Sequence, residues 1–166
     1  MMRVLVVGTF DILHPGHLYY MERARELGEE LWAIIARDSN ISHKQSPVVP
    51  AEQRRQMVEA LEVVDCAVLG SEHSIFERLR EINPDVVALG YDQHHSVVNL
   101  QAEFDRRCIE SEVVRVGGKP ADSTGLYASS HIAERCVERD NLSSTEGTVY
   151  SQGPPVAPYG LDIPTP

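Results

Sequence analysis

Residues 3–7 constrain the fold of this chain more than any other stretch. They read RVLVV, so the apolar side chains after Arg3 are consecutive rather than alternating. A strand of this kind is covered on both faces, as strands of parallel sheets are. Gly8 and a short polar turn follow, and Pro15 then opens a segment with the apolar spacing of a helix. The beginning of the chain therefore predicts a strand, a turn and a helix.

The same alternation continues along the chain. Further buried strands are expected at residues 30–36, 63–69, 85–89 and 112–116, and further helices at 50–61, 74–82, 96–109 and 129–139. Five strands that alternate with helices predict the α/β class, with a Rossmann-like, doubly wound, five-stranded parallel sheet. Residues 37–50 are polar and carry Pro47 and Pro50, which predicts a long loop.

The end of the chain has a different composition. Residues 141–166 hold five of the ten prolines and three glycines, without any apolar periodicity. Such a segment cannot bury enough apolar surface to order itself. We therefore expect one folded domain at 1–140 and a disordered tail at 141–166.

Composition excludes several classes of function. The net charge of −10 leaves no basic footprint for a nucleic acid. We see neither a membrane-spanning run nor a signal peptide, which predicts a cytoplasmic protein that binds no membrane. Three widely spaced cysteines predict neither a disulfide framework nor a zinc site. Lysine occurs only at Lys44 and Lys119, and this acidic, lysine-poor surface resembles that of halophilic proteins. Assembly into a homodimer is left open.

Two histidines mark the start of the first helix. His14 and His17 are three residues apart, so they share one face if the first turn is helical. That face lies beside a helix N-terminus, which favours an anion. The alternatives are an ordinary pair of surface or core histidines, and half of a metal site with Asp11. We interpret the pattern as phosphate chemistry.

Other candidate residues follow the ends of the expected strands. Lys44 lies in the long loop and can reach the β- and γ-phosphates of a nucleotide, although a solvated loop lysine is the simpler interpretation. Asp92 follows a glycine after the strand at 85–89, where it can bond a ribose hydroxyl or an adenine amine, or simply form a turn. Carboxyl ends of parallel strands meet at one edge, so these residues can share a site with Gly8 and Thr9.

A family resemblance rests on these motifs. Residues 8–17, GTFDILHPGH, resemble the signature of the cytidylyltransferase-like nucleotidyltransferases, whose HxGH motif binds a nucleoside triphosphate. The chain is most similar to archaeal FAD synthases, over about residues 2–138. This similarity also rests on the segments ARD, PAEQRRQMVEALEVVD, AVLG and ALGYDQ. The resemblance implies transfer of AMP from ATP to FMN, with Mg²⁺ or another divalent cation accompanying ATP. The resemblance also implies that one of Arg54 and Arg55 faces the site, without saying which.

The segment 128–132, ASSHI, resembles the ISTT-type segment of the family but has Ala128 and serines in place of threonines. Its hydroxyls stand at a helix N-terminus, and Tyr127 can flank the base. The residues and the resemblance together assign nucleotide binding to Gly8, Thr9, Phe10, His14, Pro15, Gly16, His17, Asp92, Tyr127, Ser129 and Ser130. They assign catalysis to His14, His17 and Lys44, acceptor or phosphate contacts to Asp11, Arg54 and Arg55, and no metal ligand.

The acceptor has candidate residues of its own. Phe10, Ile12, Leu13 and Tyr91 lie near the motifs and can form an apolar wall for a flavin ring. The alternatives are a cytidylyl- or adenylyltransferase acting on glycerol 3-phosphate or a sugar phosphate, and a nucleotide-binding sensor without turnover. The complete set of candidate residues favours an enzyme. The cysteine pair that we expect near the C-terminus of an archaeal FAD synthase is missing.

Overall fold

The structure is a computed structural model that describes residues 1–41, 46–91, 93, 95–117 and 126–146, the last five as backbone only. The chain divides into two compact units, Met1–His131 and Ile132–Pro166. The first unit contains the whole sheet and all the helices except the greater part of the last one.

The first unit is built on a five-stranded sheet in which every strand pair is parallel. The strand order is β3-β2-β1-β4-β5, and Gly8 at the end of β1 pairs with Ile35 at the end of β2. All carboxyl ends therefore lie at one edge. The strands are β1 (Arg3–Gly8), β2 (Glu30–Ile35), β3 (Cys66–Leu69), β4 (Val86–Leu89) and β5 (Glu112–Arg115).

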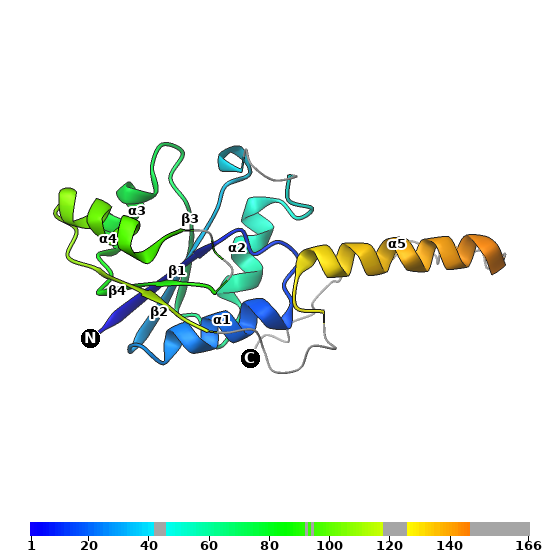
Figure 1. Ribbon diagram of the computed structural model, residues 1–166, viewed down its shortest axis with the longest axis horizontal. Helices are drawn as coiled ribbons and strands as arrows, with labels where there is room; N and C mark the ends of the chain where they lie inside the picture. The colour runs from blue at the N-terminus through cyan, green and yellow to red at the C-terminus, as the bar shows by residue number, and fades with distance from the viewer. Residues whose placement is uncertain (42–45, 92, 94, 118–125, 147–166) are drawn as a thin grey trace, which may run out of the picture. The chain divides into compact units, whose positions relative to one another are not determined.

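Helices cover both faces of this sheet (Figure 1). The covering helices are α1 (Pro15–Arg25), α2 (Ala51–Glu59), α3 (Ile75–Ile82) and α4 (Val97–Arg106). The chain also forms a 3₁₀ turn η1 (Asp38–Asn40) and a last helix α5 (Ser129–Glu146). Alternate side chains of each strand supply two cores. Val4 and Val6 pack with Met21 of α1 and Val58 of α2, whereas Leu5 packs with residues of α3 and α4.

The predicted class and sheet are confirmed. Every expected strand and helix is present. The observed ends differ from the expected ones by a few residues, because the expected ranges included capping residues and residues just outside the strands. The last helix is an exception, since it continues to Glu146 instead of ending at residue 139. The expected disordered tail stays a prediction, because residues 147–166 lie outside the described part of the chain. No helix of the described residues is long and apolar enough to cross a membrane.

The strand order changes direction between β1 and β4. From β1 the chain adds β2 and β3 on one side, then crosses to β4 and β5 on the other. Ligands of such sheets bind at the carboxyl edge beside this switch point. Two side chains bridge it: the Tyr20 hydroxyl donates to the Ala88 carbonyl at 2.6 Å, and the Gln93 amide donates to the Val7 carbonyl at 2.7 Å.

Replacing Tyr20 tests the first of these bridges. Tyr20→Phe removes the side-chain donor of a partly buried carbonyl of β4, so we expect the free energy of unfolding to fall by about 1 kcal/mol. Tyr19→Phe is the matched control, because the neighbouring ring contacts the Arg23 guanidinium through its face. Urea unfolding of both variants measures the difference. Equal stabilities would contradict the bridging role of Tyr20.

Candidate functional site

The turn after β1 is organised by the ring of Phe10, which points back into the core. Phe10 is 3% exposed, and a Cβ placed on Gly8 would lie 2.8–3.0 Å from its ring carbons. Gly8 is therefore required for the ring to lie over the end of β1. Because it is buried, the ring does not form the open apolar wall that the sequence suggested.

The backbone of this turn is strained. Phe10 has φ 53° and Ile12 has φ 49°, both in the left-handed region that favours glycine. Each such residue costs roughly 1–3 kcal/mol unless contacts around it hold the conformation. The path from β1 to α1 therefore depends on the groups that bind the turn.

His14 and His17 lie together at the start of α1. Their rings stack with centroids 3.7 Å apart and 20° between the planes, and the edge of Phe10 meets His17 at 5.3 Å between centroids. His14 caps α1, because its Nδ1 accepts the backbone N–H of His17 at 3.3 Å. A neutral His14 that accepts through Nδ1 carries its proton on Nε2.

His17 is held as a neutral imidazole. Its pKa is lowered from 6.5 to about 3, chiefly by burial and also by the neighbouring His14, while Asp11 acts in the opposite direction. The Nδ1 atom of His17 is buried and has no hydrogen-bond partner among the described residues. Nε2 of His17 is then the nitrogen that can meet a ligand, and a neutral imidazole offers an N–H donor there.

The approach to α5 lies directly against the start of α1. A Cβ on Gly16 would be 2.5 Å from the backbone carbonyl oxygen of Tyr127 and 3.0 Å from the His14 ring. Glycine is therefore required here for the two segments to meet. Ser129 and Ser130 are the first two residues of α5. The structure thus places Tyr127, directly before the ASSHI segment, beside the HPGH segment, with Pro15 in the first turn of α1.

Arg54 of α2 is buried beneath this site. Its side chain is 1% exposed, and each of its three nitrogens donates a hydrogen bond within the protein. The acceptors are the carbonyls of Val49 at 2.8 Å, Thr9, and Ala36 at 2.9 Å, and the carboxylate of Asp38 at 2.6 Å. Arg54 therefore binds the ends of β1 and β2 from within, whereas a phosphate ligand needs an exposed guanidinium.

Two carboxylates complete this arrangement. Asp11 accepts the backbone N–H groups of Val48 at 2.9 Å and Val49 at 3.0 Å. Asp38 accepts the Ala51 N–H at 3.2 Å, at the start of α2. Partial burial alone would raise the pKa of Asp38, but the bonds from Ala51 and Arg54 outweigh it and lower that pKa. Sequence reasoning did not single out Asp38, although it stands in the ARD step.

Arg55 does not lie at the site around His14 and His17. Its guanidinium pairs with Glu52 at 2.8 Å and Glu59 at 2.6 Å, and it donates to the Ala67 carbonyl of β3 at 3.3 Å. Arg55 therefore ties α2 to the edge of the sheet. The sequence could not separate the neighbouring arginines, because both follow the start of one amphipathic helix.

A further group of side chains holds the segment after β4. Gln93 bonds the Gly90 N–H as well as Val7, and Arg115 of β5 donates to the carbonyls of Gly90, Gln93 and His95. Asp92 and Lys44 lie outside the described residues, so their assignments stay predictions. Among the described residues no group of three or more His, Cys, Asp or Glu side chains is placed to hold a metal ion.

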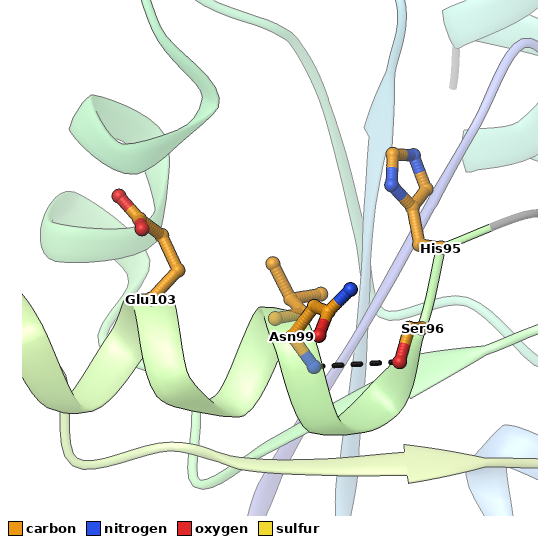
Figure 2. Close-up of a pocket in the computed structure, with 5 residues that line it drawn as sticks. His95, Ser96, Asn99 and Glu103 are labelled. Carbon is orange, nitrogen blue, oxygen red and sulfur yellow. Dashed lines mark hydrogen bonds between the residues drawn. The ribbon is translucent and has the colours of Figure 1, made fainter.

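A separate, shallow hollow lies on α4. His95, Ser96, Asn99, Leu100 and Glu103 line it, and the Asn99 N–H donates to the Ser96 hydroxyl at 3.4 Å (Figure 2). Glu103 is already paired with Arg106 and Arg107. The hollow is lined by α4 and the two residues before it, whereas the histidine pair lies at the start of α1 on the other face.

Comparison with known proteins agrees with this geometry. A family model described as cytidylyltransferase-like matches residues 5–146. An FAD synthase of Archaeoglobus profundus is 45% identical over 155 residues, which cover 92% of this chain and 99% of that protein. An FAD synthase of Methanohalophilus mahii is 50% identical over 139 residues, covering 84% of this chain and 96% of that protein.

A solved structure supports the same fold. The lipopolysaccharide core biosynthesis protein from Thermoplasma volcanium superposes with a TM-score of 0.70 at 36% identity, covering 72% of this chain and 99% of that chain. A protein with unknown function from Archaeoglobus fulgidus has the same fold at 17% identity and a TM-score of 0.58.

The lowered pKa of His17 predicts a loss of stability in acid. Below pH 6.5 the unfolded chain gains a proton that the folded chain does not, so falling pH favours unfolding until the folded pKa of about 3 is reached. Between pH 7.5 and 5 we expect the wild type to lose roughly 1–2 kcal/mol more than His17→Gln. Urea unfolding at both pH values measures this. Parallel losses in the two proteins would refute the neutral state.

Proposed function

This chain belongs to the cytidylyltransferase-like family, and we propose that it is a nucleotidyltransferase that moves AMP from ATP to the phosphate of FMN, giving FAD and pyrophosphate. The observation that carries the proposal is the stacked pair His14 and His17 at the start of α1. It lies at the carboxyl edge of the sheet, beside the switch point. The names of the relatives supply the acceptor.

The reaction needs no covalent intermediate. A phosphate oxygen of FMN attacks the α-phosphorus of ATP in line, a P–O bond forms, and the bond to the β-phosphate bridging oxygen breaks as pyrophosphate leaves with the electron pair. An ionised phosphate is already a nucleophile, so no strong general base is required. Catalysis is then positioning and stabilisation of the charge that develops on the phosphate oxygens.

Several candidate residues are proposed to divide this work. Nε2–H groups of His14 and His17 donate to phosphate oxygens, and the N-terminal turn of α5 with Ser129 and Ser130 offers a second anion-binding group. Lys44 is proposed to bind the leaving pyrophosphate, and Asp92 the ribose or adenine.

A divalent cation is proposed to arrive with ATP. We propose no protein ligand for the ion, and the described residues contain no group of three or more His, Cys, Asp or Glu side chains placed to hold one. Bound to the phosphates of ATP, it would neutralise part of their charge.

The other proposed properties follow from the reaction and the composition. ATP and FMN are small cytoplasmic molecules, so a cytoplasmic enzyme without a nucleic-acid or membrane partner is proposed. The likeness to the Thermoplasma volcanium protein keeps a sugar phosphate as the second candidate acceptor. A homodimer remains open.

An assay of products tests the proposal directly. Purified protein with ATP, FMN and Mg²⁺ should yield FAD and pyrophosphate, identified by mass, and high salt should support the reaction by screening the acidic surface. His14→Ala and His17→Ala should each lower turnover by about 10²-fold or more, because each removes a donor to the developing charge. Circular dichroism checks that both variants are folded.

Two results would count against the proposal. CTP-dependent product from glycerol 3-phosphate or a sugar phosphate, without FAD, would replace the acceptor while keeping the reaction class. Nucleotide binding with no product from any acceptor would favour a sensor.

A further inference from the structure

We propose that Arg54 and Asp11 are positioning residues, which hold the strained turn after β1 in the one conformation that presents the His14–His17 pair to the nucleotide. The role rests on the proposed function, since it concerns the same reaction. It differs from the phosphate contacts expected from sequence, because both side chains are already bound by the backbone of neighbouring segments.

The first observation is a closed ring of hydrogen bonds. Arg54 donates to the Thr9 carbonyl and, through Nε, to the Val49 carbonyl at 2.8 Å. The Val49 N–H donates to Asp11 at 3.0 Å, and Asp11 is two residues from Thr9. The ring therefore returns to the turn from which it started. Its links carry an ionised group at one end, which makes them the stronger class of hydrogen bond.

The second observation is where the strain lies. The two residues with positive φ, Phe10 and Ile12, immediately flank Asp11. Such conformations persist only where surrounding contacts hold them. Arg54 donates to the carbonyl of Thr9, the residue before Phe10. Asp11, between the two strained residues, accepts from the backbone N–H groups of residues 48 and 49. Losing either link allows the turn to relax.

The third observation connects the turn to the chemistry. The Phe10 ring lies over Gly8 and contacts His17 with its edge, at 5.3 Å between centroids. His17 in turn stacks on His14. A relaxed turn moves the Phe10 ring, and the imidazoles move with it. A displacement of about 1 Å in a catalytic group can lower a rate about 10²-fold.

The test uses Arg54→Met and Asp11→Asn, with Arg78→Met as the matched control. Arg78 is also a helix arginine that donates to a carbonyl at a strand end, Leu69 at 3.0 Å, and pairs with a glutamate, Glu81 at 2.5 Å. It belongs to α3, away from the turn. Asp11→Asn keeps the shape of the side chain and remains informative if Arg54→Met does not fold.

Steady-state kinetics separates positioning from binding. Arg54→Met and Asp11→Asn should lower kcat for FAD formation about tenfold or more and change KM for ATP by less than about threefold, because the turn and not the nucleotide loses a contact. Arg78→Met should match the wild type. A variant with unchanged kcat and a strongly raised KM for ATP would overturn the proposal in favour of direct phosphate binding, and wild-type kinetics in both variants would also overturn it.

A second measurement does not depend on the acceptor. Imidazole resonances of His14 and His17, recorded by NMR without substrates, should shift in Arg54→Met and Asp11→Asn and stay in place in Arg78→Met. Unmoved resonances in a folded Asp11→Asn protein would refute the positioning role. If the wild type forms no FAD, the proposed function fails, while this measurement still decides the role of the two residues.

Discussion

The packing of the Phe10 ring over Gly8 is the contact on which the site depends. It buries an aromatic ring at the carboxyl end of the central strand, and it forces the backbone through two left-handed residues before α1 begins. The same ring then supports His17 from its edge. A side chain at Gly8 would displace the ring and, with it, the surface on which His17 lies.

The sheet supplies the frame for this contact. Because β1 and β4 are neighbours at the switch point, Tyr20 and Gln93 can bind carbonyls across it, and the segment after β4 is brought beside the turn after β1. The site thus combines segments far apart in sequence. Burial keeps His17 unprotonated, so in the proposed reaction this donor would stabilise phosphate charge without a charge of its own to desolvate.

Much of this could be predicted from the sequence, for reasons that are local. Continuous apolar runs marked the five strands, and the HPGH motif placed both histidines on one helix face. Partners in space could not be predicted. The residues around Arg54 and Arg55 in the sequence do not distinguish one arginine from the other. Only the fold places the carbonyl groups of three segments around Arg54. Phe10 was expected in an apolar wall for the acceptor, whereas its ring packs into the core over Gly8. The extension of α5 to Glu146 runs through serines and threonines that are poor markers of a helix.

The central claim is that His17 meets the nucleotide as a neutral imidazole through Nε2–H. ¹⁵N NMR of the histidine side chains, with and without a non-hydrolysable ATP analogue, tests it most directly. The account predicts the neutral pattern with Nε2 protonated from pH 8 to pH 5, and a shift of that N–H signal when the analogue binds. An imidazolium pattern at pH 6 in the free protein, or an Nε2–H signal that the analogue leaves unchanged, would contradict it.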